Sequence, residues 1–177
     1  MKKNEYLVLF VALILTLFNC SSNDDSSSTK EIVLTVKTFG GTSNESARAI
    51  TKTTDGGYII LGSTQSNDHD ITDKTEIGFD FWVLKFSSAH DLQWAKTYGG
   101  SDDDRGSDII QTSDGGFAII GSSKSNNEDV DTNAGAQDYW IVKLDNSGNI
   151  SWQKSFGFSG LDNGISLLQT IDNGYLL

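Results

Sequence analysis

Asp114-Gly115-Gly116-Phe117 is one of three copies of a short motif, each followed by apolar residues. Asp55-Gly56-Gly57-Tyr58 lies 59 residues upstream, and Asp172-Asn173-Gly174-Tyr175 lies 58 residues downstream. Asp-Gly and Gly-Gly provide the positive φ angles of tight hairpin turns, and we expect Gly116 to adopt this conformation in its copy. A period of this length predicts a series of similar units that are stacked or arranged in a circle.

Other landmarks repeat with the same spacing. The segment Asp80–Lys85 returns as Asp138–Lys143, and Trp94 returns as Trp152, so all four tryptophans occupy repeated positions. Two complete units and the beginning of a third are therefore predicted, at residues 37–95, 96–153 and 154–177.

Each complete unit has the pattern of four strands. In the second unit these strands are expected at 106–112, 117–121, 138–144 and 150–156. The third strand is apolar on both faces, whereas the fourth alternates apolar and polar residues. No helical periodicity is convincing after residue 20. The pattern predicts an all-β fold made of four-stranded antiparallel blades of a β-propeller.

The repeated motifs resemble a known family. Gly-Gly-Ser-x-x-Asp at 99–104, Asp-Gly-Gly-Phe at 114–117 and Trp-Ile-Val-Lys at 140–143 resemble the bacterial β-propeller repeat family called SBBP. The resemblance covers about residues 37–177 and implies a fold more than an activity. The third unit departs from the pattern, because Phe158 replaces the second glycine of Gly-Gly and Asn173 replaces a glycine of the turn.

The two ends of the repeat region predict a partial β-propeller over residues 31–177. A strand expected at 31–39 aligns with the fourth strand of a unit, as ring closure by the N-terminal strand requires. Leu177 falls inside a predicted strand. We therefore expect a fragment of a ring of six to eight blades, which needs roughly 350–500 residues at this period. An open array capped by a partner is the alternative.

The first twenty residues have the pattern of a signal peptide. Lys2 and Lys3 precede an apolar run at 6–18 that is too short to span a bilayer comfortably. The run ends in Leu17-Phe18-Asn19-Cys20, which resembles a bacterial lipobox and implies lipidation at Cys20, although Phe18 and Asn19 depart from the usual pattern. The alternative is a buried cysteine in an ordinary signal or anchor segment.

Residues 21–30 contain almost no apolar side chains and are predicted to be a flexible tether. Their Ser/Asp-rich start resembles the export signal of Bacteroidota lipoproteins. That resemblance implies a lipid-anchored protein of the outer membrane that faces the cell surface. A plain linker would have the same composition.

The composition limits the partners and the chemistry. The formal net charge of −11 makes nucleic acid a poor partner, because such binding depends on Lys and Arg contacts to phosphates. Acidity by itself favours solubility. The single cysteine excludes an intrachain disulfide and a multi-cysteine metal site.

Acidic residues gather in the loops on one face of the predicted blades. Asp68 and Asp70 lie in one loop, and Asp129 lies in the aligned loop of the next unit. Carboxylate oxygens from flexible loops are typical Ca²⁺ ligands, so a Ca²⁺ site at these residues is a hypothesis. The alternative is that Asp and Asn simply form solvated turns.

No catalytic motif is recognisable. His69 and His90 are not repeated between units, and the four tryptophans are better explained by core packing than by sugar stacking. We predict a binding or scaffold module for a glycan or a protein. The alternative is a carbohydrate-active or other hydrolytic propeller whose catalytic residues, such as a carboxylate pair, lie in further blades.

Overall fold

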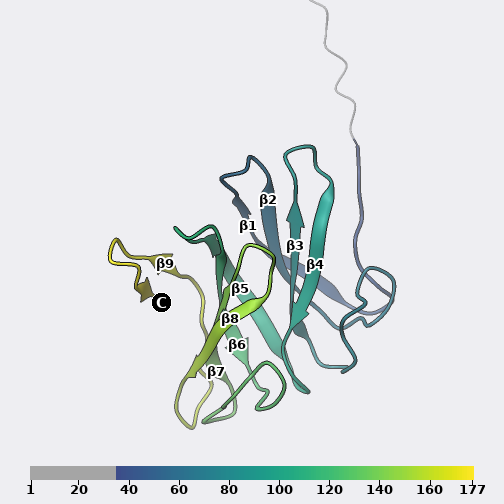
Figure 1. The fold of residues 1–177 in the computed structure, drawn as a ribbon. Coiled ribbons are helices and arrows are strands. Elements are labelled where there is room, and N and C mark those ends of the chain that lie inside the picture. Colours follow the sequence, from purple (N-terminus) through teal and green to yellow (C-terminus); the bar gives the residue numbers. More distant parts are fainter. Residues whose placement is uncertain (1–34) are drawn as a thin grey trace, which may run out of the picture. The chain divides into compact units, whose positions relative to one another are not determined.

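Short β-strands joined by turns account for all the regular structure of residues 35–177, the part of the chain that this computed structural model describes (Figure 1). The first blade is a four-stranded antiparallel sheet in the order β1-β2-β3-β4, and the second repeats it as β5-β6-β7-β8. The strands of the first blade are β1 (Glu45–Lys52), β2 (Tyr58–Thr64), β3 (Asp80–Phe86) and β4 (Leu92–Tyr98). Those of the second are β5 (Asp104–Gln111), β6 (Phe117–Ser123), β7 (Asp138–Leu144) and β8 (Ile150–Phe156), and the third unit contributes β9 (Leu168–Gln169) and β10 (Tyr175–Leu176).

The predicted fold class is confirmed: the structure is all-β and is built from four-stranded antiparallel blades of the propeller type. The bounds of β7 and β8 agree with the sequence pattern, whereas β5 begins two residues earlier than expected. A bulge between Gly106 and Asp108 separates the early part of β5 from the apolar residues Ile109 and Ile110 that marked this strand in the sequence. The described sheets do not close into a ring.

The Asp-Gly-Gly hairpins need their two glycines for different reasons. Gly115 has a φ of 83°, and its equivalent Gly56 has a φ of 82°. Gly116 does not have a positive φ, so the expectation for this residue is corrected. A Cβ on Gly116 would instead collide with the carbonyl oxygen of Leu144 on β7. The first glycine therefore permits the turn, and the second permits the close approach of the neighbouring strand.

The two blades pack face to face through one apolar cluster. Ile59, Leu61, Phe81 and Val83 of the first blade meet Phe117, Ile119, Trp140, Val142 and Leu144 of the second. Phe81 and Trp140 stand at the centre, with ring centroids 4.7 Å apart. Both faces of β6 and β7 carry buried apolar residues because each blade is covered on both sides, as the sequence pattern predicted.

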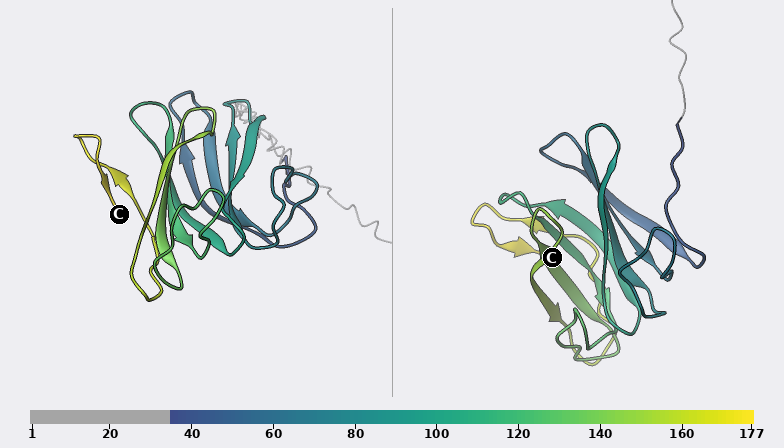
Figure 2. Two further views of the ribbon diagram at one scale, coloured as in Figure 1. Left: turned by 60° about the horizontal axis from the view of Figure 1, so that its bottom comes forward. Right: turned by 45° about the vertical axis from the view of Figure 1, so that its right-hand side comes forward.

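The same packing relation continues into the third unit. Ala118, Ile120 and Ile141, on the other face of the second blade, pack against Leu167 and Tyr175. These two residues are the equivalents of Ile109 and Phe117 in the preceding interface. In both views of Figure 2 the C-terminal segment, drawn in yellow, lies beside the second sheet. Consecutive units therefore associate head to tail, in the sense that the same two faces of a unit contact the unit before it and the unit after it.

The segment before β1 takes the place of a fourth strand without forming one. Residues 35–39 have no strand pairing, so the predicted strand 31–39 is wrong over its described part. Lys37 Nζ lies 3.7 Å from Asp91 Oδ1, and Lys96, at the equivalent position of β4, donates at 2.8 Å to Oδ1 of Asn149, the equivalent of Asp91. Phe39 packs edge-on against Phe86. The sequence alignment of this segment with β4 is thus matched by its contacts.

Residues Lys37–Leu177 form one compact unit. The predicted signal peptide 1–20, Cys20 and most of the expected tether and first strand lie outside the described residues. No helix among residues 35–177 is long and apolar enough to cross a membrane.

Candidate functional site

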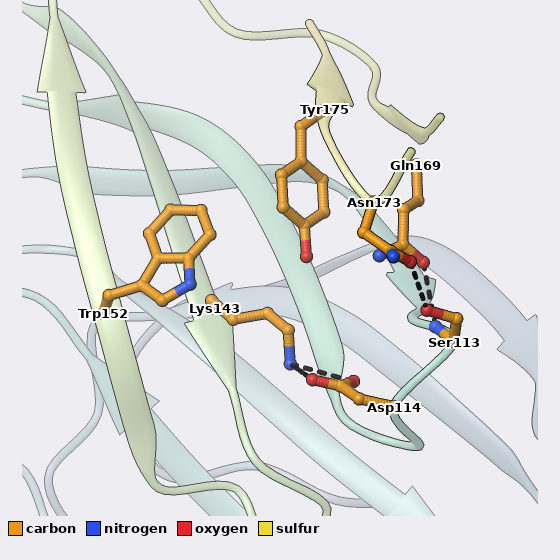
Figure 3. Close-up of a pocket in the computed structure, with 7 residues that line it drawn as sticks. All are labelled: Ser113, Asp114, Lys143, Trp152, Gln169, Asn173 and Tyr175. Carbon is orange, nitrogen blue, oxygen red and sulfur yellow. Dashed lines mark hydrogen bonds and ion pairs between the residues drawn. The ribbon is translucent and has the colours of Figure 1, made fainter. Parts of the chain in front are cut away.

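A pocket recurs wherever one unit packs against the next, on the side of the molecule that carries the Asp-Gly-Gly turns. The first inter-blade pocket, between the two blades, has a volume of about 450 Å³, and the second, between the second blade and the third unit, has about 440 Å³. The second pocket is lined by Ser113, Asp114, Lys143, Trp152, Gln169, Asn173 and Tyr175 (Figure 3). The first is lined at the equivalent positions by Thr54, Asp55, Lys85, Trp94, Gln111, Gly115 and Phe117.

An ion pair forms one wall of each pocket. Lys85 Nζ lies 2.8 Å from Asp55 Oδ2, and Lys143 Nζ lies 2.9 Å from Asp114 Oδ2. The lysine side chains are almost completely buried, whereas about half or more of each aspartate side chain is exposed. Each lysine also donates at 2.9 Å to the carbonyl at the end of its own strand. The buried lysine therefore holds a carboxylate that faces the pocket.

Hydrogen bonds keep both aspartates ionised. The Thr112 hydroxyl, Lys143 and the Gly116 amide donate to Asp114 and lower its pKa to about 2. The pKa of Asp55 is lowered in the same way, first by the hydrogen bond from Lys85 and then by that from Thr53. Each pocket consequently presents hydrogen-bond acceptors at neutral pH.

Two aromatic rings form the apolar part of each pocket. Trp94 and Phe117 stand edge to face with centroids 6.1 Å apart, and Trp152 and Tyr175 do so at 5.6 Å. Trp94 packs closely against the β7–β8 turn: a Cβ added to Gly148 would lie 3.0 Å from the indole ring of Trp94. Trp152 is 41% exposed, so the second pocket offers more aromatic surface.

Glutamine side chains join the units at the pocket. Gln111 Oε1 accepts from the Thr54 amide at 2.8 Å, and Gln169 Oε1 accepts from the Ser113 amide at the same distance. Ser113 also donates through its hydroxyl to Asn173 at 2.9 Å, as Figure 3 shows. These bonds fix the position of each unit relative to the preceding one and thereby shape the pocket.

The lysines and glutamines of the pockets were not singled out in the sequence. Lys85 and Lys143 recur with the Asp-Gly-Gly motifs, as do Gln111 and Gln169, so the repeat itself was the available signal. The prediction for tryptophan is correct for Trp82 and Trp140, which are 5% and 0% exposed. It is wrong for Trp152, whose ring lines a pocket because β8 is less covered than β7.

The loops predicted to hold Ca²⁺ bind backbone amides of the chain. Asp68 Oδ1 accepts from the Thr42 amide at 2.9 Å, and Asp70 Oδ2 accepts from the Gly40 amide at 2.9 Å. In the next unit Asp129 Oδ2 accepts from the Gly99 amide at 3.3 Å. The carboxylates of each loop thus accept hydrogen bonds from the Gly-Gly segment, or its neighbour, that precedes the first strand of the blade.

The two loops are closely alike despite their different sequences. His69 and Glu128, at aligned positions, both have positive φ angles, of 53° and 59°. Both loops are turns whose residues are largely exposed, as the interpretation of solvated turns expected. Residues 35–177 contain no group of three or more His, Cys, Asp or Glu side chains arranged to hold a metal ion. The Ca²⁺ site stays a prediction, and its proposed ligands have a structural role that the sequence did not reveal.

Buried carboxylates lie near the same glycines. Asp80 pairs with Lys74 at 3.0 Å, yet burial outweighs this attraction and raises the pKa of Asp80 to about 7. Burial also raises the pKa of Asp104, which accepts hydrogen bonds from the Gly100 amide and the Ser125 hydroxyl. A Cβ on Gly99 would meet both carboxylates, so only glycine fits between them.

The sequence matches no protein-family model and no curated protein. The repeated pocket is therefore the feature on which a function can be argued.

Proposed function

We propose that this protein is a binding module whose inter-blade pockets take neutral glycans. The observation that carries the proposal is the recurrence, in two successive interfaces, of an ionised aspartate, a buried lysine, a tryptophan and a glutamine around one pocket. Aromatic rings provide apolar contact for the C–H face of a sugar, while carboxylates and amides bond its hydroxyl groups. Volumes of 440–450 Å³ lie within the usual range for small-ligand sites.

The charge state of the pocket favours binding over hydrolysis. A glycosidase needs a general acid whose pKa is raised, so that the carboxyl group carries a proton at the working pH. The pKa values of Asp55 and Asp114 are shifted in the opposite direction. Repetition also favours binding, because several equivalent weak sites on one molecule increase the avidity for a polymeric glycan.

A panel of immobilised neutral glycans, probed with the full chain, tests the proposal. Trp152→Ala removes an aromatic wall of the second pocket and leaves only the first intact, so the avidity for an immobilised polymeric glycan should fall about tenfold or more. Phe156→Ala is the matched control, because this ring lies on the same strand, is 45% exposed and does not line the pocket. Equal binding by the two variants, or no binding by the unmodified chain, would refute the proposal.

We further propose that the chain is a cell-surface lipoprotein of the SBBP-like type, anchored to the outer membrane through Cys20. The charged N-terminus, the short apolar run and the lipobox-like ending support this location. Metabolic labelling with a fatty acid should mark the unmodified protein and not the Cys20→Ser variant. Equal labelling of both proteins would contradict the anchor.

A further inference from the structure

Both arginines of the chain line a single pocket. The sequence contains only Arg48 and Arg105, among thirteen basic residues and twenty-four acidic ones. They meet at a pocket of about 470 Å³, whose other lining residues include Ser107, Ser122, Gln137 and Asn163. We propose that this pocket, called here the arginine pocket, binds a hydroxylated organic carboxylate. This proposal is independent of the glycan site, which lies at different residues.

The pocket lies where the first strands of successive units come together. Arg48 is on β1, Arg105 and Ser107 are on β5, and Asn163 belongs to the corresponding segment of the third unit. β1 and β5 are in contact with each other. A ligand here would touch three successive units at once.

The arginines are not required for the formation of a blade. The equivalents of Arg48 are Ser107 and Ile165, and the equivalents of Arg105 are Ser46 and Asn163. β5 forms with Ser107 at the position of Arg48, and β1 forms with Ser46 at the position of Arg105. A function specific to this pocket explains two arginines here better than a structural requirement of the repeat does.

Arg105 is held in place, whereas Arg48 is available. Arg105 stacks on Phe79, with its guanidinium carbon 3.6 Å from the ring centroid, and lies 3.6 Å from Asp103 Oδ2. Its side chain is nevertheless 46% exposed. Arg48 is exposed, and within residues 35–177 no hydrogen bond or ion pair engages it. One arginine can thus serve as a fixed platform and the other as a free bidentate donor.

The remaining lining residues define the rest of the ligand. Asn163 Oδ1 accepts from Gln137 at 2.6 Å and from the Ser122 hydroxyl at 3.2 Å, which leaves the Asn163 amide group free to donate. The pocket is much larger than a single carboxylate group. Neutral donors and acceptors beside two guanidinium groups suit a molecule with both a carboxylate and hydroxyl groups, such as a sugar acid.

Isothermal titration of the full chain with D-glucuronate tests the proposal, with D-glucose as the neutral control. Glucuronate should bind and glucose should bind at least about tenfold more weakly, because only the acid can pair with a guanidinium group. Inorganic phosphate at the same concentration should fail to displace glucuronate, because phosphate cannot make the hydroxyl contacts. Displacement of glucuronate by equimolar phosphate would show that the oxyanion alone is recognised and would contradict the proposal.

The decisive variant is Arg48→Gln, because this residue is exposed and its loss should not affect folding. We expect about a tenfold or greater loss of glucuronate affinity. Lys52→Gln removes one positive charge from the exposed end of the same strand and is the matched control. Equal affinity in the two variants, equal affinity for glucose and glucuronate, or no glucuronate binding at all would overturn the proposal.

Discussion

At the scale of the residue, the main role of the loop and turn carboxylates is to accept hydrogen bonds from backbone amides. Asp68, Asp70 and Asp129 accept hydrogen bonds from the amides of the Gly-Gly segments and their neighbours, and Asp114 accepts one from the Gly116 amide at 3.0 Å. Removing such an acceptor leaves a backbone amide without a hydrogen-bond partner. The resulting loss of folding free energy exceeds the net stabilisation that the hydrogen bond provided.

The first prediction concerns Asp129. Asp129→Ala should lower the free energy of unfolding by about 1 kcal/mol, because the Gly99 amide loses its acceptor. Asp129→Asn should be milder, since the amide oxygen can still accept. Asp131→Ala, at an exposed position in the same loop, should have little effect in chemical denaturation. If the three variants have the same free energy of unfolding, the structural role assigned to Asp129 is contradicted.

The calcium hypothesis can be examined on the same proteins. If Asp68, Asp70 and Asp129 hold Ca²⁺, the ion should raise the melting temperature of the unmodified chain, because a ligand that binds only the folded state stabilises it. The shift should be smaller in Asp129→Ala, which leaves Asp68 and Asp70 in place, and should persist in full in Asp131→Ala. An unchanged melting temperature of the unmodified chain in millimolar Ca²⁺ would exclude the site.

The pKa of Asp114 predicts a pH dependence. Its folded-state pKa of about 2 lies below the unfolded value of about 3.9, so the folded state binds fewer protons between these limits. The stabilisation is present above about pH 4 and is lost as the pH falls toward 2. Urea unfolding should show Asp114→Asn to be less stable than the unmodified chain at pH 5, with the difference shrinking by pH 2.5. A difference that is constant with pH would contradict the role of the charge.

At the scale of the element, the hairpin turn distinguishes its two glycines. Gly115→Ala should cost about 1 kcal/mol of stability, because alanine resists a φ of 83° while a Cβ there meets no atom within 4 Å. Gly115→Asn should cost less, since Asn173 adopts a φ of 65° at the equivalent position. Gly116→Ala should cost more than either, because its Cβ would strike the Leu144 carbonyl. Thermal unfolding gives the order directly, and a reversed order for the two alanine variants would refute this account.

At the scale of the whole molecule, apolar residues of the third unit remain uncovered. Ile171 and Leu176 are 103% and 61% exposed, and Phe158 and Leu161 are also highly exposed. Apolar patches of this kind promote association. The head-to-tail packing of the units shows how a further sheet could cover such a surface.

We therefore predict that residues 31–177 self-associate in solution. Light scattering after size-exclusion chromatography should detect species larger than a monomer. Replacing Ile171 and Leu176 by lysine should shift the population toward the monomer, whereas Ile77→Lys, at an 82% exposed position in the first blade, should not. A monomer for the unmodified protein at all concentrations would contradict the prediction.

Local pattern alone determined the repeat and the strands of the two blades, although it wrongly predicted a strand at 35–39 and placed the start of β5 two residues late. The Asp-Gly-Gly motifs marked the hairpins, and the two-sided apolar pattern of Asp138–Leu144 marked a strand covered on both faces. Strand periodicity and turn chemistry act over a few residues, so a single sequence records them directly. The repeat of Lys37 as Lys96 was also readable, and the structure places the two lysines beside the equivalent residues Asp91 and Asn149.

Only the tertiary structure decided which side chains meet. Lys85 is thirty residues from its partner Asp55, and Arg48 shares a pocket with Arg105 on another blade. The partners of Asp68 and Asp129 also come from distant segments, which gives these predicted metal ligands a structural role as acceptors for backbone amides. Such pairings depend on how strands are ordered and how blades stack, and no local pattern encodes them. The hydrophobic faces of the strands bring the blades together, and the polar groups at their edges then find partners that depend on that arrangement.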